Sequence, residues 1–113
     1  MRKPQKVNIL GTEYSIVIKK QEEIQKALGN DKVEVDGLCD YQDKTIYIDD
    51  MIAKEPYSYT TTLRHEIVHA FIEESGLSTQ VSWARNESLV DWIALQVPKI
   101  SAVCSELNLL GGK

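Results

Sequence analysis

The chain has 113 residues, of which 42% are hydrophobic and 27% charged, and its formal net charge is −4. This length supports one domain, residues 1–113, and the acidic balance argues against nucleic acid as a partner because phosphate binding calls for a basic surface. With no apolar run near the roughly 20 residues that span a bilayer and no signal-peptide pattern, we expect a soluble, cytoplasmic protein that does not bind membranes.

The N-terminal part predicts a β-hairpin followed by a short helix. In residues 7–18 apolar and polar residues alternate, and Gly11 and Thr12 offer the turn. Residues 21–28 carry apolar side chains at helical spacing and two glutamates in the first turn, and Gly29 is a typical stop signal.

Residues 33–48 return to a period of two, which is typical of strands. We expect a short strand at residues 33–35, a second at 38–41 and, after a polar turn at 42–44, a third at 45–48. The last three strands and the hairpin would form one small, mainly antiparallel sheet.

Helical patterns fill most of the remaining chain. A first helix is predicted from Ser58 or Thr60 to residue 74, and a second over residues 82–97, closed by Pro98, which cannot continue a helix. Residues 100–110 then predict a last amphipathic helix. The order of hairpin, helix, strands and three helices indicates an α+β fold.

Apolar residues at helical spacing on the first two of these helices are expected to face the core. On the earlier helix they are Leu63, Ile67, Ala70 and Phe71, and on the later helix Trp83, Val90, Trp92, Ile93 and Val97. We interpret them as packing residues and not as part of a ligand site.

The chain has two histidines, His65 and His69, and Glu66 directly follows the first. The chance of this arrangement in a random order of the residues is on the order of 0.002. Positions i and i+4 share one face of a helix, so both imidazoles can reach one metal ion. Glu66 lies at the flank of that face, where its carboxylate can act as a general base on a metal-bound water.

A catalytic zinc needs a third protein ligand, which here must be Asp, Glu or Cys because no further histidine exists. On the next helix, Glu87 and Asp91 are again four residues apart and share a face. One of them can bind the metal while the other bonds the far nitrogen of a histidine ligand and fixes its tautomer. Spacing alone leaves both assignments open.

These motifs, HEIVH at residues 65–69 and NESLVD at 86–91, resemble the HExxH and NExxxD of thermolysin-like zinc metallopeptidases, the gluzincins. The resemblance implies a minimal zincin-like domain, with a small sheet packed on the histidine helix, the glutamate helix and a C-terminal helix. It implies one zinc ion per chain, bound by His65, His69 and Glu87. It also implies that Glu66 is the general base and that Asp91 orients a histidine ligand.

In that family an edge strand before the active-site helix pairs with an extended peptide or protein substrate, and residues 45–48 hold that place in the chain order. The resemblance therefore implies these substrate-binding residues: Thr45, Ile46, Tyr47 and Ile48. No downstream motif matches the oxyanion stabilisers of the family. The candidates by chemistry alone are Tyr41, Tyr57, Tyr59 and Arg85.

The small size of the chain is similar to that of compact bacterial and phage zincins such as the ImmA/IrrE type, which cleaves repressors. Two other classes of function compete with a peptidase. One is a zinc-bearing regulatory or protein-binding module without turnover, and the other is a helical interaction protein without metal. Glu66 favours the enzyme, because a site that only binds zinc would not require it.

Cys39 and Cys104 are expected to be buried, inert thiols.

Overall fold

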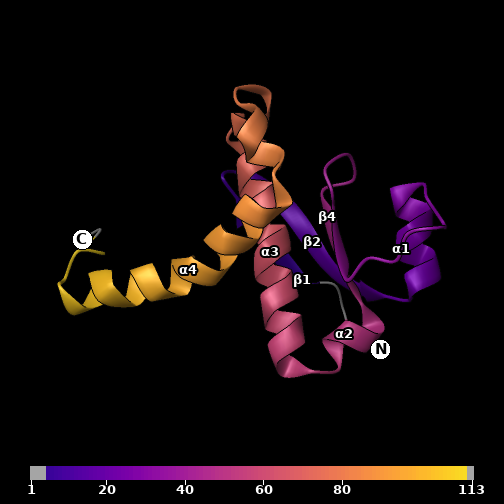
Figure 1. The fold of residues 1–113 in the computed structure, drawn as a ribbon, viewed down its shortest axis with the longest axis horizontal. Coiled ribbons are helices and arrows are strands. Elements are labelled where there is room, and N and C mark those ends of the chain that lie inside the picture. Colours follow the sequence, from indigo (N-terminus) through magenta and orange to yellow (C-terminus); the bar gives the residue numbers. More distant parts are fainter. Residues whose placement is uncertain (1–4, 112–113) are drawn as a thin grey trace.

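The computed structural model describes residues 5–111 and shows an α+β domain, as the sequence predicted (Figure 1). One sheet has the strand order β1-β2-β4-β3. Its strands are β1 (Gln5–Ile9), β2 (Thr12–Lys19), β3 (Gly37–Asp40) and β4 (Thr45–Asp49). The helices are α1 (Gln21–Leu28), α2 (Asp50–Ala53), α3 (Pro56–Glu74) and α4 (Glu87–Glu106), and two 3₁₀ turns are η1 (Leu77–Thr79) and η2 (Ser82–Arg85).

The hydrophobic core lies between α3 and one face of the sheet. β2 and β4 run parallel, with Ile16 beside Ile46 and Ile18 beside Ile48. Because successive side chains of a strand point to opposite faces, this register gathers isoleucines on one side, where Ile46 and Ile48 are fully buried. Burying each such side chain contributes roughly 1.5–3 kcal/mol. This face therefore holds α3 against the sheet.

The predicted hairpin is confirmed, but its turn lies one residue earlier than Gly11 and Thr12. Leu10 and Gly11 form the connection, with φ angles of 51° and 94°. Positive φ at both central residues is typical of the type I′ turn, whose twist matches that of a hairpin. The side-chain oxygen of Asn8 accepts a hydrogen bond from the Gly11 N–H at 2.8 Å. Thr12 is therefore free to begin β2.

Helix α1 has the predicted bounds, and Gly29, with a φ of 81°, closes it. The strand predicted at residues 33–35 is wrong: this segment is a loop. The Gln21 side chain accepts from the Val35 N–H and donates to the Val35 carbonyl, both at 2.9 Å. The Gln25 side chain donates to the Val33 carbonyl at 2.7 Å. Since α1 side chains already pair these backbone groups, the segment needs no strand partner.

Helix α3 begins at Pro56, earlier than the predicted Ser58 or Thr60. The Glu55 carboxylate accepts a hydrogen bond from the Ser58 N–H at 2.8 Å and so caps the helix. Proline at the first position loses no helical hydrogen bond and its φ already suits a helix. The end of α3 at Glu74 is as predicted.

The two helices predicted on either side of Pro98 are one helix, α4. It begins at Glu87 because the Asn86 side chain accepts a hydrogen bond from the Leu89 N–H at 2.9 Å, and residues 82–85 form η2 instead. Pro98 lies inside α4, where its missing N–H and its ring cost about 3 kcal/mol, and α4 bends partway along (Figure 1).

Within residues 5–111 no helix combines the length and the apolar character needed to cross a membrane.

The predicted core of the later helix is only partly correct. Val90 and Ala94 are buried where α4 packs on α3, but Trp83, Trp92 and Val97 are exposed. On α3, Ala70 is buried, while Leu63 and Ile67 are half-buried against the core, and Phe71 is exposed. Trp92 and Val97 lie outside because α4 contacts the domain only along the side that carries Val90 and Ala94, whereas Trp83 belongs to η2 and not to α4.

Glu74, the last residue of α3, joins the helix to the sheet. Its carboxylate accepts hydrogen bonds from the Lys44 ammonium at 2.7 Å, the Tyr14 hydroxyl at 2.7 Å and the Thr12 hydroxyl at 2.9 Å. Lys44, Tyr14 and Thr12 together lower the pKa of Glu74 from 4.5 to about 2. Burial and the bond to Glu74 raise the pKa of the Tyr14 hydroxyl.

Glu74→Gln is expected to lower the melting temperature at neutral pH. A carboxylate whose pKa is depressed on folding contributes stability above its unfolded pKa, and this stability is lost as pH falls toward the folded value. The difference in melting temperature between wild type and variant should thus shrink from pH 4.5 to pH 2. Thermal unfolding across this pH range measures it. Glu13→Gln, an exposed site on β2, is the control. A constant difference for Glu74→Gln would show that the ionised Glu74 carboxylate does not stabilise the fold.

Candidate metal centre

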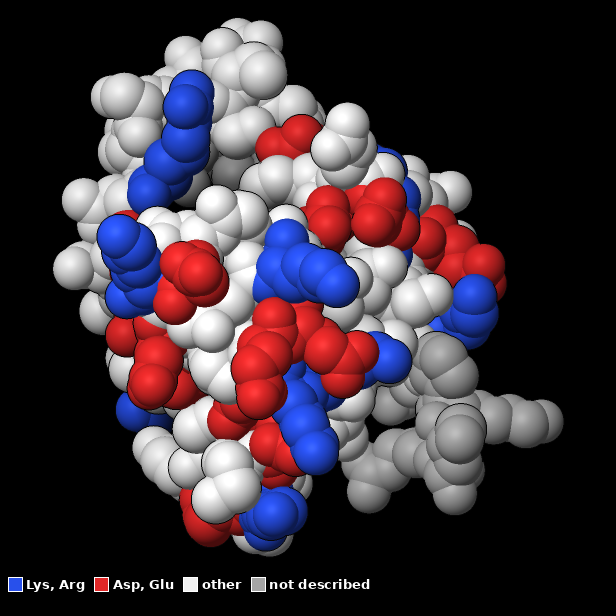
Figure 2. Space-filling model, turned by 90° about the vertical axis from the view of Figure 1, so that its right-hand side faces the viewer, with Lys and Arg blue, Asp and Glu red and all other residues white. Residues whose placement is uncertain are grey.

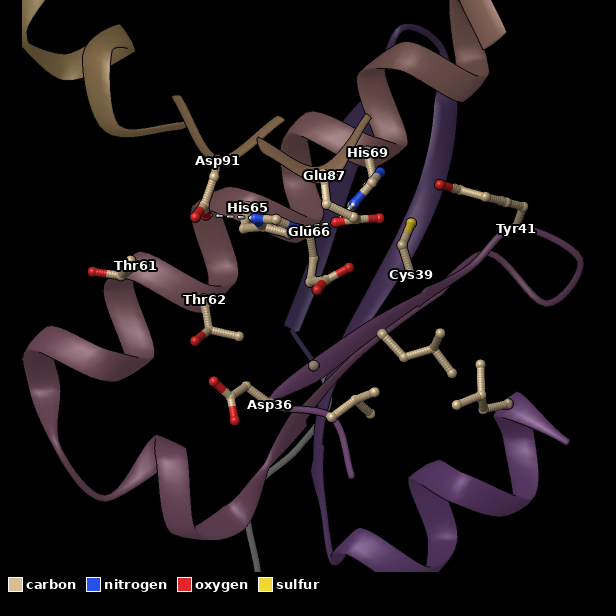
Figure 3. Close-up of a pocket in the computed structure, with 14 residues that line it drawn as sticks. Asp36, Cys39, Tyr41, Thr61, Thr62, His65, Glu66, His69, Glu87 and Asp91 are labelled. Carbon is tan, nitrogen blue, oxygen red and sulfur yellow. Dashed lines mark hydrogen bonds and ion pairs between the residues drawn. The ribbon is translucent and has the colours of Figure 1, made fainter. Parts of the chain in front are cut away.

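Two packed helices bring the predicted site residues together (Figure 3). His65 and His69 lie one turn apart on α3, and Glu87 and Asp91 lie one turn apart at the start of α4. The Asn86 cap fixes where α4 begins, and so places Glu87 in its first turn. The sequence separation between the two helices is bridged by η1 and η2.

Three donor atoms converge on one point. The Nε2 atoms of His65 and His69 lie 3.0 Å and 3.1 Å from the same oxygen, Oε1 of Glu87. These three possible metal-ligand atoms, which we call the donor cluster, lie within 4.8 Å of one another. Bonds of about 2.0–2.1 Å at tetrahedral angles would place zinc ligands about 3.3 Å apart. Two imidazoles and one carboxylate suit a zinc ion, and the two nitrogen–oxygen separations of 3.0 Å and 3.1 Å are close to this spacing.

Asp91 holds the other side of His65. Its Oδ1 lies 2.9 Å from the Nδ1 of His65, whereas the Nε2 of the same ring faces Glu87. In the neutral imidazole, an Nδ1–H group that donates a hydrogen bond to Asp91 leaves Nε2 without a proton, so that its lone pair can bind a metal. Burial disfavours the charged form of His65, but the bond to Asp91 and the nearby Glu66 and Glu87 carboxylates outweigh it and raise its pKa. The two carboxylates thus differ in position: Glu87 contacts the Nε2 atoms of both histidines, and Asp91 contacts the Nδ1 atom of His65.

Glu66 lies at the bottom of the site and is 7% exposed. Burial raises its pKa to about 7; the neighbouring His65 opposes this shift, and the carboxylates of Glu87 and Asp36 add to it. In Figure 3 its carboxylate points into the pocket beneath His65 and Glu87 and not away into the core. A carboxylate in this position can accept a proton from a water molecule bound among the three donors.

A cavity of about 670 Å³ opens in front of these residues. One wall is α3 with His65, Glu66 and His69, and the opposite wall is β3 with the loop before it. The remaining lining residues are Leu28, Val35, Asp36, Gly37, Leu38, Cys39, Tyr41, Thr61, Thr62, Glu87 and Asp91. Glu87 has 70% of its side chain exposed, so the donor cluster is open to solvent on the α4 side.

Gly37 allows β3 to approach α3 closely. A Cβ atom at this position would lie 2.9 Å from both Thr62 Cγ2 and the Tyr47 carbonyl oxygen, and 3.2 Å from Cγ of Glu66. Any larger residue would therefore push β3 away from α3 and disturb Glu66. The sequence alone could not identify this role of Gly37, because only the folded structure reveals what Gly37 packs against.

The assignment of the substrate strand to residues 45–48 is wrong. β4 is hydrogen-bonded to β2 on one side and β3 on the other, so its backbone cannot accept a further strand. The side chains of Ile46 and Ile48 are in the core, while Thr45 and Tyr47 are half-buried. The open edge nearest the site is β3. Chain order alone could not reveal this, because β4 follows β3 in the chain but lies between β2 and β3 in the sheet.

Of the four candidate oxyanion stabilisers, Tyr41 and Arg85 lie near the donor cluster. Both line a second cavity of about 480 Å³, which also contacts His69 and Glu87. Tyr57 and Tyr59 belong to the first turn of α3, where Tyr57 is exposed and Tyr59 packs against the core. Tyr41 borders both cavities, and its hydroxyl faces His69 and Glu87 in Figure 3.

Cys39 is buried in the wall of the first cavity, as an inert thiol would be, whereas Cys104 is only half-buried. Burial and the nearby Glu66 carboxylate raise the pKa of the Cys39 thiol. A protonated thiol is a poor nucleophile and a poor metal ligand. The chemistry of the pocket therefore rests on the histidines and carboxylates.

Comparison of the chain with protein-family models, with curated protein sequences and with solved structures finds no match.

Proposed function

We propose that this chain is a zinc-dependent peptidase. The observation that carries the proposal is the convergence of His65, His69 and Glu87 on one point beside the buried Glu66. Two histidines and one carboxylate leave the fourth position of a tetrahedral metal free, which is typical of catalytic zinc and not of structural zinc. A metal-binding module without turnover would not need Glu66 at the bottom of an open cavity.

Each residue then has a separate task. When bound, zinc would polarise the scissile carbonyl and lower the pKa of its water. Glu66 accepts the proton of that water, and the same carboxyl group later donates a proton to the leaving amine. Asp91 keeps His65 in the tautomer that presents its Nε2 to the metal. Tyr41 and Arg85 are the donors beside the cluster that could bond the carbonyl oxygen.

The proposed substrate is an extended peptide or protein segment. It would add to the free edge of β3, which forms the cavity wall opposite Glu66, and backbone hydrogen bonds would hold it there. Leu28, Val35 and Leu38 give that side of the cavity an apolar lining. We therefore expect a preference for an apolar substrate side chain at this wall.

Metal content and cleavage together test the proposal. Protein purified without added metal is expected to contain about one zinc per chain by elemental mass spectrometry. It should cleave a library of unstructured peptides, and a chelator should stop the reaction until zinc is restored. Absence of zinc, with none taken up on addition, would overturn the proposal. Zinc without cleavage of any peptide would leave a metal-binding module.

A further inference from the structure

The second part of α4 stands away from the domain in Figure 1. We call residues 92–110 the α4 arm. Its large apolar side chains are exposed by between 37% and 67%; they are Trp92, Leu95, Val97, Ile100, Val103, Leu107, Leu109 and Leu110. The sequence predicted that this segment packs on the domain, but α4 is buried only at Val90 and Ala94. Within residues 5–111 only Ala94 of the arm is buried, and the large apolar side chains of the arm stay exposed.

The α4 arm is also poor in charge. Lys99 and Glu106 are its two charged residues, although charged residues make up 27% of the chain. The face that carries α1 is very different, with acidic and basic side chains interspersed over it (Figure 2). An apolar surface of this extent on a protein whose other face is well charged marks an interaction site.

We propose that the α4 arm pairs with the α4 arm of a second copy of this chain, in antiparallel orientation. Ile100, Val103 and Leu107 recur at intervals of three and four residues and so form one apolar stripe. Lys99 and Glu106 are seven residues, or nearly two turns, apart and lie on the same flank of that stripe. In an antiparallel pair the same flanks face each other, which places each Lys99 opposite Glu106 of the second copy.

This charge pattern favours a second copy of the chain, in antiparallel orientation, as the partner of the arm. In a parallel pair the flank with Lys99 and Glu106 would face the other, uncharged flank of the second copy and gain no ion pair, whereas the antiparallel pair gains two by symmetry. From residue 92 to the end of α4 at Glu106 the arm is about 22 Å long, so the interface is smaller than the roughly 800 Å² per partner of a standard complex. We therefore expect a dimer with a dissociation constant in the micromolar range. The donor cluster does not take part, so this pairing does not depend on the proposed peptidase activity.

Sedimentation equilibrium of the full chain between about 2 and 200 μM tests the pairing. The wild type should change from monomer to dimer, and Val103→Asp should remain monomeric. Lys99→Glu and Glu106→Lys should each weaken dimerisation by about tenfold, since like charges then face each other. The double variant, which exchanges the two charges, should return to within about threefold of the wild type. Lys26→Glu, on α1, is the matched charge control.

Circular dichroism shows whether each variant keeps its fold. A wild type that stays monomeric at 200 μM would overturn the proposal, because the arm would then serve another occupant. A dimer that Val103→Asp leaves intact would place the interface elsewhere and overturn it as well. If the two single variants weaken the dimer but the double variant does not recover, the antiparallel arrangement is wrong.

Discussion

Glu66→Gln is expected to lower kcat for peptide hydrolysis by on the order of 10³-fold, because the amide cannot accept a proton from water. Zinc content should stay at about one per chain, since the three donors are untouched. Glutamine has nearly the same shape as glutamate, so the close packing of Cγ near Gly37 should be kept. The measurements are steady-state kinetics on a cleaved peptide and elemental analysis of the same preparation.

Glu22→Gln, an exposed site on α1, removes the same charge far from the cavity and should leave kcat unchanged. Equal activity of the Glu66 variant and the wild type would show that another group is the base, or that the cleavage comes from a contaminating protease. This experiment separates the peptidase from a zinc-bearing module, because a module shows no activity that depends on Glu66.

His69→Ala is expected to abolish both zinc binding and the stabilisation that zinc gives. Free zinc at 1,000 times its dissociation constant would stabilise the folded wild type by about 4 kcal/mol. With one of the three donors gone, the variant should have the same melting temperature with zinc and with a chelator. Calorimetric melting under both conditions measures the shift, and comparing each protein with itself removes any direct cost of the substitution.

Phe71→Ala is the control for this experiment, because Phe71 is an exposed residue two positions further along α3 and lines neither cavity. It should keep the response to zinc. If His69→Ala still takes up about one zinc per chain and is stabilised by it, His69 does not belong to the site.

Features set by neighbouring residues could be predicted well from the sequence. The bounds of α1 follow from its apolar spacing and from Gly29, and the hairpin follows from alternation around Gly11. That each helix carries two site residues on one face was predictable for the same reason, since i and i+4 spacing on a helix is a local property. That the two faces meet was expected only from the resemblance of the two motifs to those of zinc metallopeptidases. In the structure the two faces meet, and His65 and His69 contact Glu87 and Asp91.

Features set by distant parts of the chain could not be predicted. The place of β4 inside the sheet depends on its parallel pairing with β2, for which no local signal exists. The loop at Val33 and Val35 has the alternation of a strand, but the side chains of Gln21 and Gln25 form hydrogen bonds with its backbone in place of a neighbouring strand. Pro98 is a strong stop signal, yet α4 continues through it. Trp92 is exposed because it lies on the side of α4 that does not carry the buried Val90 and Ala94.

The location of Glu87 on the last helix has a consequence for how the protein matures during synthesis. The sheet and α3 precede it in the chain and can fold as the ribosome releases them, since N-terminal segments generally fold first. Until α4 emerges and docks, His65 and His69 have no third donor. A nascent chain would therefore hold zinc weakly and remain inactive. If the chain is the peptidase that we propose, its hydrolytic capacity would arise only once α4 has docked on α3.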